Sequence, residues 1–328
     1  MSKAVVIRGA GDVDVLDIAE VARPVAGAGE VLVEIAAAGL NRADCLQRRG
    51  FYPAPAGAAA DVPGLEFAGT VVELGAGATR FAIGERVMGI AGGGAMATHI
   101  AAHERTLVPV PAGLDLERAA AVPEVFMTAY DALFLQAGLT VGDEVVIHAA
   151  GSGVGTAAIQ LVARVGARAI GTSRDEGKLE RCRALGMAEG ILVDGEKRFA
   201  DAVRALSGGQ GAAIILDSIG AAYLEENMRA LAVGGRLVVI GLLGGASGAL
   251  SLGLLLSRRA RVFGTVLRSR PLEEKAELAQ KFTAHVLPLL ADGRLVPVVD
   301  SVMPMAEVRE AHRRMEANDT FGKIVLRW

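Results

Sequence analysis

Residues 145–155 constrain the fold of this chain more than any other segment. They read Val-Val-Ile-His-Ala-Ala-Gly-Ser-Gly-Val-Gly, so a run of β-forming residues stops at small residues, and a helix-compatible run follows at once. This order is typical of a strand, a turn and a helix whose N-terminus can approach a pyrophosphate, because backbone N–H groups and the helix dipole stabilise phosphates there. The segment therefore predicts dinucleotide binding by the loop residues Ser152, Gly153, Val154 and Gly155.

The pattern that continues from this loop is one of alternating strands and helices. Helices are predicted to begin near Gly153, Glu176, Arg198 and Ala222, and strands are predicted at residues 144–148, 168–172, 190–194, 214–217, 236–240 and 261–265. Such alternation implies βαβ units and a doubly wound parallel sheet, so the fold class is α/β.

The two ends of the chain have a different pattern. Residues 1–122 are β-rich, with apolar or alternating runs at 30–36, 69–74 and 86–90 that are separated by Pro and Gly. Residues 267–328 predict an amphipathic helix at 273–291 and a strand pair near 296–302 and 322–326. With 328 residues in all, a chain of this length is expected to form two domains.

Composition excludes several classes of function. The net charge is −3, and no block of Lys and Arg suggests nucleic acid or an anionic membrane as a partner. The two cysteines, Cys45 and Cys182, are far apart and lack metal-ligand spacing, which favours a reducing cytosol, and the N-terminus does not resemble a signal peptide. Residues 237–256 carry no charge, but their five glycines favour a buried strand, a loop and a short apolar helix over a membrane span. A cytoplasmic location is therefore expected.

The junction after the second predicted strand bears on the choice of dinucleotide. NAD-specific folds place an acid there, roughly 20 residues beyond the glycine turn, to bond the ribose 2′-hydroxyl. This chain has Ser173 and Arg174 at that place, with Lys178 one helical turn on, and these side chains suit a 2′-phosphate. Asp175 and Glu176 follow directly. If one of them occupies the position of the NAD-binding acid, the site favours NAD; otherwise they are acids at a helix N-terminus, where they stabilise the helix dipole. We expect NADPH.

Two later strand ends run into small residues, at Gly220 and at Gly241-Leu242. Ligands lie outside the carboxyl ends of parallel strands, so both loops are predicted to face the nicotinamide half of the cofactor. The other interpretation is that these glycines only satisfy the geometry of their turns.

Across its whole length the chain resembles the zinc-free quinone oxidoreductases of the medium-chain dehydrogenase/reductase superfamily. The resemblance rests on residues 39–44 (Gly-Leu-Asn-Arg-Ala-Asp), residues 63–69 (Pro-Gly-Leu-Glu-Phe-Ala-Gly) and the glycine-rich loop. Residues 267–270 and 322–326 look most like the p53-inducible quinone oxidoreductase branch, which is related to zeta-crystallin. The resemblance to this family implies a GroES-like catalytic domain of residues 1–122 and 267–328 and an inserted Rossmann domain of residues 123–266. It also implies NADPH as cofactor and a homodimer or tetramer.

The resemblance also implies roles for individual residues. Asn41 and Tyr52 are expected to be catalytic, facing the nicotinamide and substrate, and Thr128, Leu267 and Lys323 are expected to bind the cofactor. The other interpretations are a turn residue for Asn41, a half-buried aromatic for Tyr52 and an N-cap for Thr128. Glu66 is expected to order its loop and His148 to be a packed residue, and Val193 stands where relatives have a tyrosine near the adenosine phosphate.

Zinc can be judged by the same resemblance. The zinc alcohol dehydrogenases of this superfamily place their ligands where this chain has Asn41, Leu65 and roughly Pro123, none of which can bind the ion in that way, and two cysteines cannot form a structural zinc site. His99 and His103 have helical spacing but lie in a segment that reads as strand and loop. We therefore expect no metal.

Chemistry without a metal favours an electrophile that is already activated, because no Lewis acid is present to polarise an alcohol. The preferred prediction is an NADPH-dependent quinone oxidoreductase. The near alternative is a reductase of alkenals or enones, and a third is a protein that binds NADPH without catalysis. The substrate is expected to be a small molecule whose walls come from loops such as residues 51–60, which the sequence does not shape.

Overall fold

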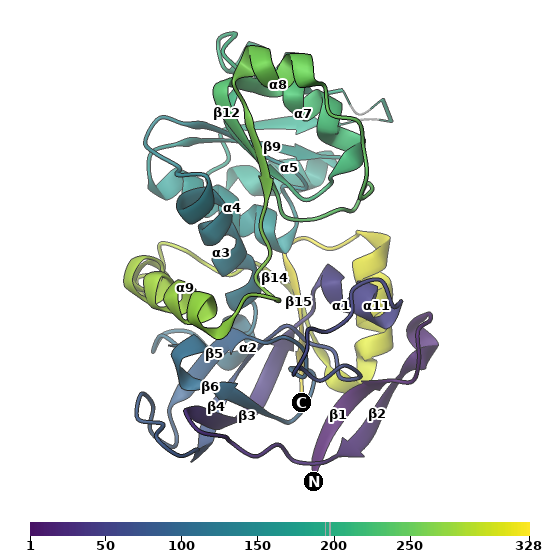
Figure 1. The fold of residues 1–328 in the computed structure, drawn as a ribbon, viewed down its shortest axis with the longest axis vertical. Helices are drawn as coiled ribbons and strands as arrows, with labels where there is room; N and C mark the ends of the chain where they lie inside the picture. The colour runs from purple at the N-terminus through teal and green to yellow at the C-terminus, as the bar shows by residue number, and fades with distance from the viewer. Residues whose placement is uncertain (194, 197) are drawn as a thin grey trace. The chain divides into compact units, whose positions relative to one another are not determined.

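The computed structural model describes residues 1–193, 195–196 and 198–328 (Figure 1). These residues form two compact units. Unit 1 comprises Met1–Met127 and Leu267–Trp328, and unit 2 comprises Thr128–Val266. Residues 123–127, which the sequence analysis assigned to the Rossmann domain, group with unit 1, where the N–H of Glu124 donates to the carboxylate of Glu66.

Unit 2 is built on a parallel sheet with the strand order β10-β9-β8-β11-β12-β13. Its strands are β8 (Glu144–Ile147), β9 (Arg168–Ser173), β10 (Glu189–Leu192), β11 (Ala212–Asp217), β12 (Leu231–Val239) and β13 (Arg261–Gly264). This order reverses between β8 and β11, as in doubly wound dinucleotide-binding sheets. The predicted fold class is therefore confirmed, although residue 194 of the predicted strand 190–194 lies outside the described residues.

The helices of unit 2 begin close to the predicted residues. They are α4 (Gly153–Arg164), α5 (Glu176–Arg183), α6 (Ala200–Leu206), α7 (Leu224–Ala230) and α8 (Leu252–Arg258), with a π-helix at Asp131–Gln136 and a 3₁₀ turn at Ala221–Tyr223. Helices α4 and α5 pack against β8, β9 and β10, whereas α7 and α8 pack against β12 (Figure 1). Because crossovers are right-handed, the reversal of strand order places these two sets of helices on opposite faces of the sheet.

Unit 1 is built on a mostly antiparallel sheet with the order β14-β15-β3-β4-β5-β7, in which β6 also pairs with β3. The strands are β3 (Glu30–Gly39), β4 (Glu66–Leu74), β5 (Arg86–Ile90), β6 (His99–His103), β7 (Leu107–Pro109), β14 (Val299–Pro304) and β15 (Lys323–Arg327). A separate hairpin joins β1 (Ser2–Ile7) to β2 (Leu16–Val21). Strand β15 pairs with β3, so the two ends of the chain share one sheet, as the resemblance implied.

The helices of unit 1 are α1 (Arg42–Arg48), α2 (Leu116–Ala119), α9 (Leu272–His285), α10 (Leu287–Ala291) and α11 (Val308–Ala317), and α3 (Pro123–Tyr130) begins in this unit. Short 3₁₀ turns lie at Val13–Val15, Glu104–Thr106 and Met305–Glu307. The helix predicted at residues 273–291 is two helices, α9 and α10, because Pro288 lacks an N–H and starts a new helix at its first turn.

The uncharged segment 237–256 folds as the sequence predicted, into a strand whose Leu237 and Val238 are buried, a loop and a short apolar helix. It contains the end of β12, a loop and α8, and no residue of α8 is buried. Leu252 is 66% exposed and Leu256 is 77% exposed, so this helix presents apolar side chains outward. Within the described residues, no helix is long and apolar enough to cross a membrane.

Candidate active site

The glycine-rich loop connects β8 to α4 and has the geometry that phosphate binding requires. Ser152 is the N-cap of α4, and its Oγ accepts a hydrogen bond from the N–H of Gly155 at 3.1 Å. A Cβ on Gly155 would lie 2.5 Å from the carbonyl oxygens of Ala149 and Ala150, which is closer than real side chains approach. Glycine is therefore required where the helix begins, and the residues present fit a dinucleotide pyrophosphate.

At the junction between β9 and α5, the acidic and basic side chains have different surroundings. The Oδ1 of Asp175 accepts the N–H of Lys178 at 3.0 Å and so caps α5, while the Oγ of Ser173 accepts the N–H of Asp175 at 3.1 Å. Asp175 thus takes the helix N-cap position, the role that the sequence analysis gave to acids at this point. Arg174 is exposed. Burial raises the pKa of Tyr223, and the charge of Arg174 acts in the opposite direction and lowers it.

The ends of β11 and β12 form neighbouring loops in the same sheet. Gly220 has a φ of +81°, and a Cβ there would lie 2.8 Å from the carbonyl oxygen of Gly245 and 3.1 Å from Cδ2 of Leu242. A Cβ on Gly241 would lie 3.0 Å from the carbonyl oxygen of Ser218. Turn geometry alone therefore accounts for both glycines, and their predicted contact with the nicotinamide stays a prediction.

His148 lies in a buried chain of hydrogen bonds below these loops. Asn227 donates from Nδ2 to Asp217 at 3.0 Å, so its Oδ1 faces Nε2 of His148 at 2.7 Å and Nε2 carries the hydrogen. Nδ1 then accepts from the hydroxyl of Thr172 at 2.8 Å. Burial lowers the pKa of His148, and the ring packs edge-on against Phe199 and Tyr223, which is the arrangement of a packed, neutral histidine.

In unit 1 a cluster of buried polar groups forms around Asn41, the N-cap of α1. The backbone N–H of Asn41 donates to Asp44 at 2.8 Å. Its side-chain Nδ2 donates to Glu66 Oε1 at 3.0 Å and to the carbonyl of Gly39 at 3.2 Å, while its Oδ1 accepts from Lys323 Nζ at 2.7 Å. Both amide hydrogens are therefore used inside the cluster. A hydrogen bond from Asn41 to a substrate would have to replace one of these bonds, and its predicted catalytic role stays a prediction.

Lys323 and Glu66 are the buried ion pair of this cluster. Lys323 is 3% exposed, and Nζ lies 2.6 Å from Glu66 Oε1, 2.6 Å from the carbonyl oxygen of Leu40 and 2.7 Å from Asn41. All three ammonium hydrogens are directed at acceptors within unit 1. Lys323 holds Asn41 and Glu66 in place, and its predicted contact with the cofactor stays a prediction.

Tyr52 is held by Arg268, which the sequence analysis did not select. The guanidinium carbon of Arg268 lies 4.9 Å from the centre of the Tyr52 ring, and its NH1 donates to the Tyr52 carbonyl oxygen at 3.1 Å. Arg268 also donates to the carbonyl of Gly92 at 2.8 Å and to the side chain of Gln47. Burial raises the pKa of the Tyr52 hydroxyl, which makes no hydrogen bond within the described residues.

Glu124 is the residue of this cluster that sequence reasoning missed. It lies in the first turn of α3, and its backbone N–H donates to Glu66 Oε2 at 2.8 Å. Its own Oε2 is buried and has no hydrogen-bond partner among the described residues. Burial and the neighbouring Glu66 raise the pKa of Glu124 to about 8. The available signal was an acid inside the apolar run of residues 119–127.

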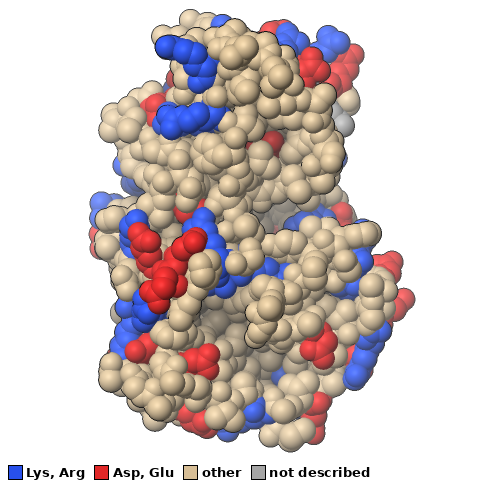
Figure 2. Space-filling model, in the orientation of Figure 1, with Lys and Arg blue, Asp and Glu red and all other residues tan. Residues whose placement is uncertain are grey.

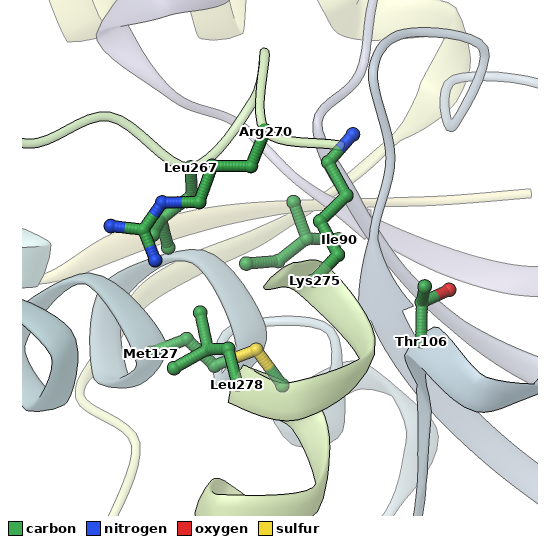
Figure 3. Close-up of a pocket in the computed structure, with 7 residues that line it drawn as sticks. All are labelled: Ile90, Thr106, Met127, Leu267, Arg270, Lys275 and Leu278. Carbon is green, nitrogen blue, oxygen red and sulfur yellow. The ribbon is translucent and has the colours of Figure 1, made fainter. Parts of the chain in front are cut away.

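Two further predicted residues are Thr128 and Leu267. Thr128 is within α3 near its end, so the N-cap interpretation is wrong, and its contact with cofactor stays a prediction. Leu267 is 4% exposed and lines a small pocket in unit 1 together with Ile90, Thr106, Met127, Arg270, Lys275 and Leu278 (Figure 3). Figure 3 shows apolar side chains facing one another across this pocket, while the ammonium of Lys275 points away from Met127.

Two observations bear on metals and nucleic acid. In the part of the chain that the structure describes, no group of three or more His, Cys, Asp or Glu is arranged to hold a metal ion. His99 and His103 lie on one strand, β6, and so are separated by about 13 Å at ~3.3 Å per residue. On the face shown in Figure 2, acidic and basic side chains are interspersed with no continuous basic band.

Two protein families match the chain. The family described as "Alcohol dehydrogenase GroES-like domain" matches residues 27–112, and the family described as "Zinc-binding dehydrogenase" matches residues 153–285. Among curated proteins, pikromycin polyketide synthase component PikAII of Streptomyces venezuelae is 34% identical over 92% of this chain and 8% of its own length. The chain spans only 5 to 15% of the length of the curated polyketide synthases that match more than nine-tenths of it.

Solved structures match over the whole chain. An NAD-dependent alcohol dehydrogenase has a TM-score of 0.88 and 33% identity, with 99% of both chains covered. The JamJ enoyl reductase has a TM-score of 0.88 and 28% identity, covering 100% of this chain and 99% of its own. A quinone oxidoreductase of Pseudomonas syringae pv. Tomato DC3000 has the same TM-score of 0.88 and 28% identity, with 100% of both chains covered.

Proposed function

The chain belongs to the medium-chain dehydrogenase/reductase superfamily, and from that premise we propose that it is an NADPH-dependent reductase of carbon–carbon double bonds conjugated to a carbonyl group. The observation that carries this proposal is the likeness of the entire chain to a solved enoyl reductase, joined by the match of nine-tenths of it to polyketide synthases. The sequence analysis preferred a quinone as substrate. That reading becomes the second candidate, supported by the equally similar quinone oxidoreductase.

The cofactor half of the proposal rests on unit 2. A bound nicotinamide dinucleotide supplies the hydride. The loop from Ser152 to Gly155 is the proposed pyrophosphate site, because it combines a helix N-terminus with the space that glycine leaves. Arg174 is the proposed partner of the 2′-phosphate, because it is exposed while Asp175 is engaged as a helix cap.

The substrate half rests on Tyr52 and its support. The Tyr52 hydroxyl makes no hydrogen bond within the described residues and is therefore the proposed donor to the substrate carbonyl oxygen. Arg268 fixes the ring through its stacked guanidinium and its bond to the Tyr52 carbonyl. The side chains of Asn41, Glu66 and Lys323 hydrogen-bond one another, and this network makes the cluster rigid.

Steady-state oxidation of NADPH by the purified chain tests this proposal. The substrates compared are an aliphatic enone, a crotonyl thioester, 1,2-naphthoquinone and 9,10-phenanthrenequinone, with product masses determined for each. We expect the enone and thioester to give saturated products, with a higher kcat/KM than the quinones.

Turnover of quinones alone would favour the second candidate. Binding of NADPH without turnover of any of these compounds would favour a binding protein and contradict both catalytic proposals. Loss of the Tyr52 hydroxyl in Tyr52→Phe should lower kcat on the enone while leaving the Kd for NADPH near its wild-type value.

A further inference from the structure

The buried oxygen of Glu124 is the unexplained polar atom of the unit 1 cluster. Its Oε2 is buried and lacks a hydrogen-bond partner within the described residues, although Asn41, Glu66 and Lys323 nearby are fully connected. Leaving a buried carboxylate oxygen without a donor costs more free energy than leaving a protonated carboxyl there. The arrangement therefore favours a Glu124 carboxyl that keeps its proton.

The surrounding charges point the same way. Glu124 is faced by two carboxylates, Glu66 on β4 and Asp44 on α1, and by two cations, Lys323 on β15 and Arg268. The charge of Lys323 is already paired with Glu66 at 2.6 Å. Burial and the charge of Glu66 raise the pKa of Glu124 to about 8, so the acid form predominates at pH 7.

No neighbour of Glu124 can easily give up a proton in its place. The hydrogens of Lys323 and of the Asn41 side chain are directed at acceptors within the cluster. Arg268 remains charged at all accessible pH values, and Asp44 accepts N–H bonds from Asn41 and from Gly64 at 2.8 and 2.9 Å. Burial raises the pKa of the Tyr52 hydroxyl above its usual value, which makes it a poorer acid.

Glu124 also lies close to the group proposed to hold the substrate carbonyl. When ionised, Glu124 raises the pKa of the Tyr52 hydroxyl, whereas the charge of Arg268 lowers it, so both groups are near Tyr52. We propose that Glu124 is the proton donor of the reaction, delivering its carboxyl proton to the substrate carbon next to the carbonyl group. This proposal rests on the proposed function, because only carbon–carbon reduction creates a carbon that needs a proton.

The step balances in atoms and electrons. The substrate accepts a hydride at its β-carbon, at the expense of the C4–H bond of the reduced nicotinamide, and becomes an enolate. The O–H bond of Glu124 then breaks and a C–H bond forms at the α-carbon, which restores the carbonyl group. The Glu124 carboxylate takes up a proton from solvent before the next turnover.

The test compares Glu124→Gln with the wild type on an enone and on 1,2-naphthoquinone. Glutamine keeps the shape of the side chain but has no acidic proton, so kcat on the enone should fall about 10²-fold, within the usual contribution of a general acid. Reduction of the quinone should stay near the wild-type rate, because oxygen anions take protons rapidly from water and need no positioned acid, unlike a carbon atom. In the wild type, kcat on the enone should decline as pH rises through about 8, and Glu124→Gln should lose this dependence.

Two further variants separate a chemical role from a structural one. Glu117→Gln changes an acid of the same unit that is 41% exposed and pairs with Arg327, and it should leave both activities and the pH profile unchanged. Glu124→Asp keeps a titrating carboxyl and should keep the alkaline decline, even if Glu124→Gln fails to fold. Melting temperature and the Kd for NADPH report on folding independently of turnover.

Each outcome of these experiments supports or overturns either the role of Glu124 or the proposed function. If Glu124→Gln reduces the enone as fast as the wild type and with the same pH profile, the assignment of Glu124 is overturned, but the proposed function still holds. Equal losses on enone and quinone also overturn it, because they indicate a structural role. A wild type that reduces no enone overturns the proposed function and this inference together.

Discussion

At the scale of single residues, we propose that Arg174 determines the preference for NADPH over NADH. Its guanidinium is exposed at the end of β9, whereas the adjacent Asp175 carboxylate is bound to the N–H of Lys178. Removal of the guanidinium in Arg174→Ala should reduce the ratio of kcat/KM for NADPH to that for NADH by about 10- to 100-fold, equivalent to a charge-assisted hydrogen bond of about 1.5–3 kcal/mol.

The control for this variant is Arg183→Ala, which removes the arginine at the end of α5 that pairs with Glu180 at 3.2 Å. It should leave the ratio unchanged. A ratio unaffected by Arg174→Ala would refute the assignment of the 2′-phosphate to this residue.

His312 makes stability depend on pH. Burial, with the charge of Arg48, lowers the pKa of His312 to about 3, so it is neutral in the folded chain, while in the unfolded chain its pKa is near 6.5. The unfolded state therefore binds more protons than the folded state at pH 3–6.5, and stability is lost as pH falls below about 6.5.

In His312→Leu the difference in unfolding free energy between pH 7 and pH 5 should be smaller than in the wild type. Urea unfolding at both pH values measures it. Asp44 and Glu124, whose pKa values are raised, titrate in both proteins, so the comparison isolates His312. An unchanged difference would mean that His312 keeps an ordinary pKa.

The sequence could not reveal residues whose role depends on distant partners. Glu124, Asp44 and Arg268 were missed as site residues because their burial and charges become apparent only when α1, β4 and the segment after β13 come together. Asn41 and Tyr52 were selected through the resemblance, which gives positions but not hydrogen-bond partners. The bonds of the Asn41 amide group, which donates to Glu66 and Gly39 and accepts from Lys323, are therefore visible only in three dimensions.

At the scale of elements, the loop between β8 and α4 is the most demanding in its sequence. Gly155→Ala would bring a Cβ within 2.5 Å of two carbonyl oxygens, so the helix start must shift. We expect a loss of stability of about 2 kcal/mol or more, in line with strained backbone sites, together with a weaker Kd for NADPH. Thermal melting and fluorescence titration measure these effects.

Gly113→Ala is the matched control, since nothing lies within 4 Å of a Cβ at that glycine. It should change neither the melting temperature nor the Kd appreciably. If Gly155→Ala bound NADPH as tightly as the wild type, the pyrophosphate would not lie against this turn.

Element types were predictable because periodicity and punctuation are local properties of the chain. The strands and helices of unit 2 begin within a few residues of their predicted starts, and β12 differs most because it starts at Leu231 instead of residue 236. The helix at 273–291 was predicted as continuous because its apolar pattern continues past Pro288, whose missing N–H the pattern does not register. The exposure of α8 was not predictable, since an apolar sequence does not say what covers it.

At the scale of the whole molecule, we propose that unit 2 joins two copies of the chain. Strand β13 pairs only with β12 in the described sheet, so its other edge is open, and α8 nearby exposes Leu252 and Leu256. Open edges and exposed apolar side chains favour association. This observation supports the homodimer that the resemblance implied.

Sedimentation velocity should show a dimer for the wild type, and the double variant Leu252→Glu/Leu256→Glu should shift the chain toward monomer. Ile83→Glu is the control, because Ile83 is an apolar residue of unit 1 that is 64% exposed. A monomeric wild type, or a double variant that remains dimeric, would contradict this interface.

The ion pair between Lys323 and Glu66 has a consequence for synthesis on the ribosome. Lys323 contacts Asn41 across 282 residues of sequence, so the hydrogen bonds among Asn41, Glu66 and Lys323 cannot form until β15 has emerged. A chain that lacks β15 also lacks the ammonium group that pairs with Glu66. Synthesis of β15 is therefore required before this cluster of unit 1 can assemble.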